Sequence, residues 1–458
     1  MTTLAAPAVS KPTRRLLDRF NRSRAVTHRL AQPLSREDMV VQTTTDVSPT
    51  KWHLAHTTWF YERFVLRRFV DRYEPFHEQY EYLFNSYYDT VGPQHCRAER
   101  GLVSRPSVDE VFAYRKEVDR RVAELIETND ADRFDELAML IELGVQHEQQ
   151  HQELIATDIK HVLSSNPLLP AYHMGDEADK ADRSTGRSPG EPRWRRFDEG
   201  VYEIGYHGQA SFDAFCFDNE TPRHRVYLHG FELADRLVTN GEYLAFVDDG
   251  GYDRPELWLS MGFATIHEQR WRHPLYWYRD SDRWMHYTLR GPQEVDPAEP
   301  VSHLSYFEAD AFARWAKARL PREAEWEVAA ADHPVEGPHQ DAWQLHPEPL
   351  SKAAAAGGTG KDARKGNSNG DKDEDATPLH QLYGNLWQWT LSQYEPYPGY
   401  HPLPGSLGEY NGKFMCNQFV LRGSSCATPA DHARLTYRNF FPPDARWQFT
   451  GLRLARDA

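Results

Sequence analysis

The 458-residue chain is long enough for two domains, and its content of 40% hydrophobic and 13% aromatic residues is ample for packed cores. The formal net charge of −15 argues against nucleic-acid binding, which depends on clustered lysine and arginine, and no stretch approaches the roughly 18 apolar residues of a membrane span. The four cysteines fit the reducing cytoplasm better than a disulfide scaffold. None of them forms a C-x-x-C pair, which argues against a thiolate zinc site.

The first third of the chain predicts a four-helix bundle. Apolar residues recur at helical spacing in four segments, and capping signals mark two of the helix starts. Ser48 followed by Pro49 is typical of an N-cap and a first helical position, and Ser107 with Glu110 forms a capping-box signature. The stretch 83–105, rich in aromatic and polar residues, is expected to be a long loop. The predicted helices cover residues 14–30, 51–70, 107–127 and 133–163.

The composition changes after the fourth helix. A polar stretch at 176–192, rich in Gly, Pro and Ser, is expected to link a domain at 12–170 to a second domain at 194–458. The second domain has few helical patterns and much Trp, Tyr, Gly and Pro, which predicts an α+β fold with much irregular structure. Residues 351–376 are of low complexity and are expected to form a mobile insertion. The second domain is expected to contain strands at 201–204, 224–228 and 419–421 and helices at 239–247 and 306–318.

His147 and His151 are the strongest candidates for a metal site. They lie four residues apart on the fourth predicted helix, so their side chains share one face. That face continues the apolar stripe of Leu140 and Leu154, and Gly144 leaves room one turn below the histidines. Two buried imidazoles side by side need a shared partner, and a Zn, Cu, Fe or Ni ion meets that need. Two core histidines bonded to carbonyls or carboxylates are the alternative.

A third ligand has to come from another helix, and His53 and His56 are its candidates. His56 shares a helix face with Trp59 and is preferred. His53 could be an outer residue that orients His56, or a capping or surface histidine near the start of the helix. Glu153 lies about 200° around the helix from His151 and is rejected as a ligand. Three histidines would leave coordination positions open for a substrate and an oxidant.

Short motifs in both halves of the chain carry a family resemblance. They are Trp-His-Leu-Ala-His (52–56), Phe-Asn-Ser-Tyr-Tyr (84–88), His-Glu-Gln-Gln-His (147–151), Asn-Glu-Thr-Pro-Arg-His-Arg-Val (219–226), Leu-Pro-Arg-Glu-Ala-Glu-Trp-Glu (320–327), Gly-Asn-Leu-Trp-Gln-Trp (384–389), Arg-Gly-Ser-Ser (422–425) and Thr-Gly-Leu-Arg-Leu-Ala (450–455). With them the chain resembles the hercynine oxygenases, the sulfoxide synthases of ergothioneine biosynthesis. In that family a DinB-like four-helix bundle is joined to a domain like the sulfatase-modifying, formylglycine-generating enzymes, which have a C-type-lectin-like fold.

The resemblance implies an oxygen-dependent reaction that forms a C–S bond. Fe(II), held by His56, His147 and His151, would bind O2 and a thiol. The sulfur would be joined to imidazole C2 of Nα-trimethylhistidine (hercynine) and leave as a sulfoxide. The resemblance selects iron, because histidine ligation by itself does not distinguish it from other metals. The thiol would be cysteine or γ-glutamylcysteine.

The implied reaction requires a proton donor near the oxygen bound to iron, and a phenol is suited to that role. The resemblance to one subtype of the family implies that Tyr87 and Tyr88 are the catalytic residues. Ordinary loop packing is the alternative for this pair. Tyr394 and Tyr397 are the second choice, because other family members carry the active tyrosine in that stretch.

Two arginines are candidates for binding the carboxylate of the sulfur donor. Arg97 and Arg100 follow the aromatic stretch, and a guanidinium can bind a carboxylate with two parallel hydrogen bonds. Exposed surface arginines are the alternative interpretation.

The hercynine pocket is predicted from the chemistry of its ligand. A trimethylammonium group favours aromatic faces, and the hercynine carboxylate favours neutral donors such as Gln150 and Asn439. Phe440 lies in a stretch that resembles the family segment closing over the metal. The commoner family pattern has Trp and then an acid where this chain has Phe440 and Phe441, so free cysteine is preferred to γ-glutamylcysteine as the donor.

Three other functions compete with this prediction. A selenoneine-type synthase would keep the fold but use a selenosugar, and a DinB-type thiol transferase would use zinc without O2. A formylglycine-generating oxidase needs a close cysteine pair near its C-terminus, whereas Cys416 and Cys426 are ten residues apart.

Overall fold

The computed structural model describes residues 10–172, 189–350 and 377–458. The chain forms two compact units, each described here by itself. Unit 1 comprises Met1–Asn166, Gly208–Cys216 and Leu403–Tyr410, and unit 2 comprises Pro167–His207, Phe217–Pro402 and Asn411–Ala458. The predicted insertion at 351–376 and most of the predicted linker at 176–192 lie outside the described residues.

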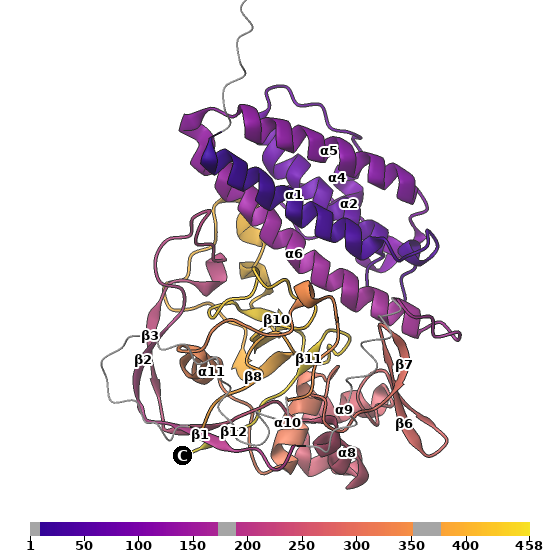
Figure 1. Ribbon diagram of the computed structural model, residues 1–458, viewed down its shortest axis with the longest axis vertical. Helices are drawn as coiled ribbons and strands as arrows, with labels where there is room; N and C mark the ends of the chain where they lie inside the picture. The colour runs from indigo at the N-terminus through magenta and orange to yellow at the C-terminus, as the bar shows by residue number, and fades with distance from the viewer. Residues whose placement is uncertain (1–9, 173–188, 351–376) are drawn as a thin grey trace, which may run out of the picture. The chain divides into compact units, whose positions relative to one another are not determined.

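Unit 1 is a four-helix bundle, which confirms the predicted fold of the first third. Figure 1 shows its four long helices, α1, α2, α5 and α6, packed against one another. All of α2 is buried, so its polar side chains must find partners inside the bundle. The helices of unit 1 are α1 (Lys11–Ala31), α2 (Thr50–Tyr61), α3 (Arg67–Phe69), α4 (Tyr80–Phe84), α5 (Val108–Thr128) and α6 (Phe134–Ser164).

The helix starts differ in how well the capping signals predict them. Ser107 caps α5, and its capping box with Glu110 is confirmed. The prediction for α2 is wrong by one residue, because Pro49 occupies the N-cap position and makes no side-chain capping bond. Ser48 instead donates its backbone N–H to Asp158 Oδ2 at 2.8 Å, which ties the start of α2 to α6.

The helix predicted at 51–70 has the expected extent but contains a π-helical turn, Glu62–Leu66, between α2 and α3. The buried Glu62 carboxylate accepts hydrogen bonds from Tyr73 Oη at 2.9 Å and Tyr114 Oη at 2.5 Å. The stretch predicted as one long loop, 83–105, also contains structure, because it includes the end of α4 and the 3-10 helix Arg97–Leu102.

A buried charge cluster fixes the packing of α1, α5 and α6. Glu148, fully buried on α6, pairs with Arg24 at 2.9 Å and with Arg115 at 2.5 Å. Its carboxylate also accepts the Thr27 hydroxyl at 2.6 Å. Loss of one partner would leave a buried charge unpaired, so the cluster specifies how these helices align.

Unit 2 has the predicted α+β character with much irregular structure. Its sheets have the strand orders β1-β4-β12, β10-β9-β8-β11, β2-β3 and β5-β6-β7. The strands predicted at 201–204, 224–228 and 419–421 are confirmed as β2, β3 and β9. The strands are β1 (Trp194–Phe197), β2 (Gly200–Ile204), β3 (His224–Leu228), β4 (Phe231–Ala234), β5 (Trp277–Asp280), β6 (Arg283–Thr288), β7 (Gly291–Glu294), β8 (Trp387–Gln393), β9 (Phe419–Arg422), β10 (Asn439–Phe441), β11 (Thr450–Gly451) and β12 (Ala455–Asp457).

The helices of unit 2 are more numerous than predicted. Helices α8 (Asn240–Asp248) and α10 (Tyr306–Trp315) confirm the two predicted ones, although α10 ends three residues before the expected Ala318. Helices α9 (Ser260–Glu268) and α11 (Glu323–Ala330) were not predicted. Neither begins with a Ser, Thr, Asp or Asn cap, because the N-cap residues are Leu259 and Arg322, so the usual signal for a helix start is missing.

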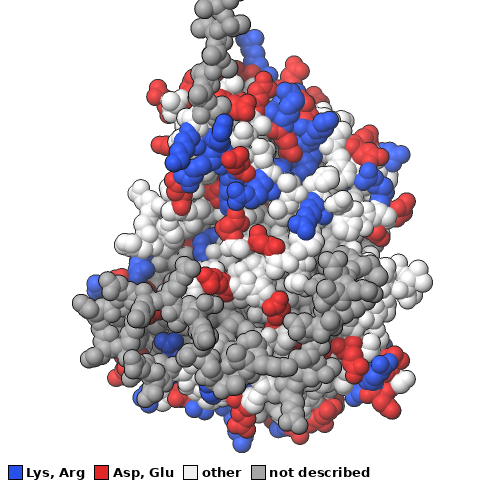
Figure 2. All heavy atoms as spheres, in the orientation of Figure 1, with Lys and Arg blue, Asp and Glu red and all other residues white. Residues whose placement is uncertain are grey.

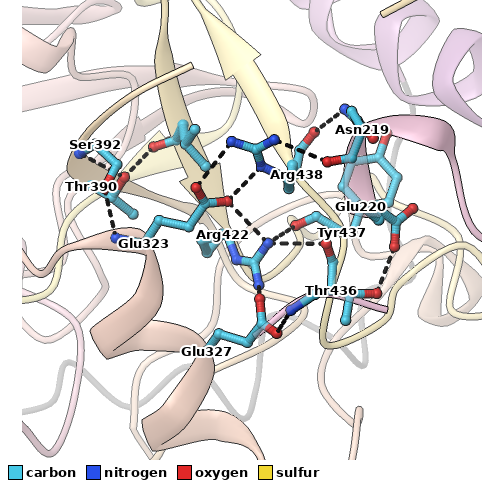
Figure 3. A network of polar contacts seen from close by, with 12 residues as sticks. Asn219, Glu220, Glu323, Glu327, Thr390, Ser392, Arg422, Thr436, Tyr437 and Arg438 are labelled. Atoms are coloured by element: carbon cyan, nitrogen blue, oxygen red, sulfur yellow. Dashed lines mark hydrogen bonds and ion pairs between the residues drawn. The ribbon is translucent and has the colours of Figure 1, made fainter. Parts of the chain in front are cut away.

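The interior of unit 2 is held by a network of buried charges, drawn in Figure 3. Arg422, fully buried on β9, pairs with Glu327 and with Glu323 of α11. It also donates to the backbone carbonyls of Thr436 and Tyr437, at 3.0 Å each. Glu323 in turn accepts from Arg438 Nε at 2.8 Å. The network joins α11 and β9 to the segment that precedes β10.

On the face drawn in Figure 2, basic and acidic side chains of the described residues are interspersed. Among the described residues, no helix is long and apolar enough to cross a membrane.

Candidate metal centre

Three histidines meet where α2 packs on α6 in unit 1. His56 comes from α2, and His147 and His151 lie one turn apart on the facing side of α6. One nitrogen from each ring lies within 4.8 Å of the others, and all three side chains are buried. Within the described part of the chain, Glu153 does not belong to this cluster. The structure therefore brings together the three residues predicted as ligands.

His56 is held with one ring nitrogen directed at the cluster. Its Nδ1 donates to the Phe84 carbonyl at 2.5 Å, which leaves the Nε2 lone pair facing Nε2 of His147 at 3.2 Å. The ring lies between the indoles of Trp52 and Trp59, with centroid distances of 4.5 and 5.6 Å. These contacts fix both the rotamer and the tautomer of His56.

His151 is oriented by a relay that begins at a carboxylate. Asp158 Oδ2 accepts from His53 Nε2 at 2.9 Å, so a neutral His53 has a bare Nδ1. That Nδ1 lies 2.8 Å from Nδ1 of His151, which donates to it and keeps its own Nε2 unprotonated. The prediction that His53 orients His56 is wrong: its ring reaches across to α6 and orients His151 instead.

The surroundings keep the three imidazoles neutral. Burial lowers the pKa of His56 and of His151 well below the ordinary value, and neighbouring histidines lower both further. Burial lowers the pKa of His147 to about 3. Neutral imidazole is the form that binds a metal ion.

The spacing of the nitrogens fits a shared ion. Two ligand atoms held at ~2.1 Å from one metal lie about 3.0 to 3.4 Å apart, depending on whether the geometry is octahedral or tetrahedral. The observed 3.2 Å between His56 Nε2 and His147 Nε2 falls in this range. Among the described residues, Nδ1 of His147 has no hydrogen-bond partner. A cation at the cluster would satisfy lone pairs that otherwise face one another in a buried space.

The predicted catalytic tyrosines lie one aromatic ring away from the histidines. Tyr87 and Tyr88 pack together with ring centroids 4.7 Å apart, and burial raises the pKa of both hydroxyls. Tyr88 packs on Trp59 at 5.8 Å, and Trp59 stacks on His56. Both phenols therefore stay protonated at neutral pH and are able to donate a proton.

A third tyrosine, Tyr410, approaches the cluster more closely and was not predicted. Its ring lies edge-on to His147 at 5.6 Å, and its hydroxyl donates to Gln150 Oε1. The neighbouring Glu409 anchors this segment by accepting from the Thr90 backbone N–H at 3.1 Å. No local pattern in the sequence marks Tyr410, because it lies 260 residues from Gln150 along the chain.

The two candidate arginines differ sharply in environment. Arg100 is 5% exposed, and its guanidinium carbon lies 3.4 Å from the centroid of the Trp52 ring. It donates to the hydroxyls of Ser48 at 2.9 Å and Ser86 at 3.0 Å. Among the described residues no carboxylate forms an ion pair with it. Arg97 is exposed and donates to a backbone carbonyl at 2.6 Å.

The remaining predicted residues belong to unit 2. Asn439 and Phe440 lie on β10, where the Phe440 ring stacks on Tyr394 at 4.0 Å. The Tyr397 hydroxyl donates to Glu323 at 3.2 Å, within the buried network of Figure 3. Tyr394 and Tyr397 thus contribute to the packing of unit 2, and the roles of Asn439 and Phe440 stay predictions.

Both parts of the chain match known families. The DinB superfamily matches residues 19–155, and the sulfatase-modifying factor enzyme 1-like domain matches residues 198–458. Hercynine oxygenase from Mycolicibacterium smegmatis is 31% identical over 90% of this chain and 91% of that protein. Hercynine oxygenase from Mycolicibacterium thermoresistibile is 32% identical over 100% of this chain and 97% of that protein.

A more distant match concerns the second part alone. Formylglycine-generating enzyme from Streptomyces coelicolor is 27% identical over 55% of this chain and 86% of that enzyme. Cys416 is exposed and Cys426 is buried, and both are free thiols. The hercynine oxygenases match both parts of the chain, including the helices that carry the histidines.

Proposed function

Because the chain belongs to the hercynine oxygenase family, we propose that it is an Fe(II)- and O2-dependent sulfoxide synthase that joins a thiol to imidazole C2 of hercynine. The proposal rests on the arrangement of His56, His147 and His151, which presents three neutral imidazoles to one point. Three protein ligands leave positions open at an ion, as a catalytic site requires. No further protein ligand is needed to complete the site.

Iron bound there would supply the redox chemistry, with O2 as the oxidant. In the overall reaction a C–H and an S–H bond break and a C–S bond forms. One oxygen atom ends on sulfur and the other leaves as water, which takes up the two released hydrogens. The protein therefore has to exclude bulk water, orient two substrates and deliver a proton to oxygen.

The proton donor is drawn from the buried tyrosines of unit 1. The predicted pair Tyr87 and Tyr88 remains the first candidate, supported by the packing of Tyr88 on Trp59, whose ring stacks on His56. Tyr410 is the second candidate, supported by its ring contact with His147. Replacement of the true donor by Phe should lower kcat by roughly 10²–10⁴-fold with little change in KM. Comparison of Tyr87→Phe, Tyr88→Phe and Tyr410→Phe identifies it.

Arg100 is the residue that we assign to binding the carboxylate of the sulfur donor. Its buried guanidinium donates to two neutral hydroxyls and lies over Trp52, the ring that stacks on His56. A guanidinium in this environment can bind an anionic ligand. Burial lowers the pKa of Arg100 to about 9, which leaves it cationic at neutral pH. Free cysteine is the preferred donor because Phe441 stands where the commoner family pattern has an acid.

Iron binding by paired variants tests the metal assignment. His147→Ala should lose stoichiometric Fe(II) after anaerobic reconstitution while its helical circular dichroism stays intact. His77→Ala, which removes an exposed histidine of the same unit, should retain the iron. Full iron retention in a folded His147→Ala protein would refute the ligand set. Iron binding without any O2 consumption in the presence of hercynine and thiol would refute the oxygenase function and favour a thiol transferase.

A further inference from the structure

A second cluster of metal-binding side chains lies in unit 2, built from His286, Glu299 and His346. One ligand atom from each residue lies within 4.8 Å of the other two, as in the histidine cluster of unit 1. All three residues are buried, with exposed fractions of 5 to 6%. We propose that this cluster is a second metal site, which binds a divalent transition-metal ion independently of the iron centre.

The distances within the cluster fit a shared ion. His346 Nε2 lies 3.1 Å from Glu299 Oε2, and the rings of His286 and His346 are 5.6 Å apart with an interplanar angle of 72°. Two atoms bound to one metal at ~2.0–2.2 Å lie about 2.8 to 3.6 Å apart, depending on whether the geometry is octahedral or tetrahedral. The observed 3.1 Å falls in this range.

The backbone holds the three residues firmly from three separate segments. His286 lies in the middle strand of its sheet, paired with Trp277 of β5 and Gln293 of β7. Glu299 is fixed through its main chain, which donates to the Asp296 carbonyl at 3.2 Å and accepts from the Asn240 N–H at 2.8 Å. Ligands carried by rigid, hydrogen-bonded backbone are preorganised for a metal.

The segment that carries His346 shows backbone strain. Trp343 and Leu345 adopt left-handed conformations, with φ of 59° and 48°, although neither is glycine. Leu345 is 1% exposed, so its side chain is locked in the core while its backbone carries an unfavourable conformation. Such strain persists where surrounding structure imposes it, and it concentrates at ligand sites. The strained turn places the His346 imidazole next to the Glu299 carboxylate.

The donor set selects the class of metal. Two imidazoles and one carboxylate suit Zn²⁺, Co²⁺ or Fe²⁺, whereas Mg²⁺ and Ca²⁺ prefer oxygen ligands throughout. The side chains of Glu299 and His346 each remain 8% exposed, which leaves the cluster accessible to an ion from solution. Since the ligands come from three segments, a bound ion would cross-link β6 to the segments that carry Glu299 and His346, and would stabilise unit 2.

Cobalt binding in a chain without the iron centre tests the proposal. Tag-free, chelator-stripped His147→Ala protein should bind one equivalent of Co²⁺, measured by elemental analysis and by its visible ligand-field absorption. The added ion should raise the midpoint of thermal unfolding. A further His286→Ala change should abolish this binding, and His267→Ala, which removes an exposed histidine of α9, should leave it unchanged.

Glu299→Gln provides a second variant that keeps the side-chain volume while removing the anionic ligand. Its affinity for Co²⁺ should fall at least tenfold while its circular dichroism matches that of the parent. The proposal is overturned if the His147→Ala chain binds no Co²⁺, or if both His286→Ala and Glu299→Gln bind it as tightly as the parent. These outcomes do not depend on catalysis by the iron centre, so they separate this site from the proposed oxygenase function.

Discussion

The His53→Ala substitution tests whether the carboxylate relay sets the metal affinity. His53 is 2% exposed, and its Nδ1 accepts a hydrogen bond from Nδ1 of His151, one of the three proposed ligands. Its removal leaves the Nδ1–H of His151 without its acceptor at 2.8 Å, so that ring is free to change tautomer and orientation. The substitution removes none of the three proposed iron ligands.

The size of the effect follows from the contacts that are lost. Removal of an outer hydrogen-bond partner of a metal ligand typically weakens metal binding by about 10- to 100-fold, or about 1.4 to 2.7 kcal/mol. The Asp158 carboxylate still accepts the hydrogen bond from the Ser48 backbone N–H at 2.8 Å, so it is not left without a partner. We therefore expect the free energy of unfolding of the metal-free protein to fall by only about 1 to 3 kcal/mol.

The assay is an anaerobic competition for Fe(II) against a chromogenic chelator. His161→Ala is the matched control, because it removes another imidazole of α6, which hydrogen-bonds to the Thr43 hydroxyl at 2.7 Å. The control should keep the affinity of the unmodified protein. An unchanged affinity in folded His53→Ala, or an equal loss in His161→Ala, would refute the relay.

Three further predictions concern packing, charge and substrate. Gly144→Ala should lower the free energy of unfolding by about 1 to 3 kcal/mol in a denaturant titration, because the added Cβ would meet Tyr61 Cε1 at 2.5 Å; no loss would contradict this packing. Burial raises the pKa of Glu148, but its arginine partners outweigh burial and hold the pKa at about 2, against 4.5 when unfolded. The stability that it contributes is thus present above pH 4.5 and lost as the pH falls toward 2, so Glu148→Gln should show a shallower loss over this range. Arg100→Met should raise KM for the thiol by roughly 10- to 100-fold, whereas the exposed Arg97→Met should not; equal effects would contradict the assignment.

Local spacing in the sequence predicted part of the histidine cluster that the structure shows. The interval between His147 and His151 fixes their shared face on any α-helix, and apolar periodicity located the helix that carries them. These features depend on interactions within a few residues, which a sequence displays directly. All residues of α2 are buried, so burial alone does not distinguish His56 from His53.

The surroundings of the histidines depend on contacts between distant segments and were predicted less well. His53 lies three residues from His56 but reaches His151 on α6, because the packing of two helices decides which ring it meets. Tyr410 ends the segment Leu403–Tyr410, which belongs to unit 1 although it is distant in sequence from the helices of the bundle. Nothing in its local sequence indicates that it lies near the histidines. Arg97 is exposed and Arg100 is buried, a difference that arises only when the chain folds. Such pairings are set by tertiary structure, which overrides local pattern.

The most direct test of the account is product analysis with isotopically heavy O2. Protein reconstituted with Fe(II) is mixed with hercynine and cysteine under the labelled gas, and the products are identified by mass spectrometry. The account predicts a hercynine–cysteine sulfoxide linked through imidazole C2, with one heavy oxygen atom on sulfur, and no such product from His147→Ala. A conjugate without labelled oxygen, or no conjugate with either cysteine or γ-glutamylcysteine, would contradict it.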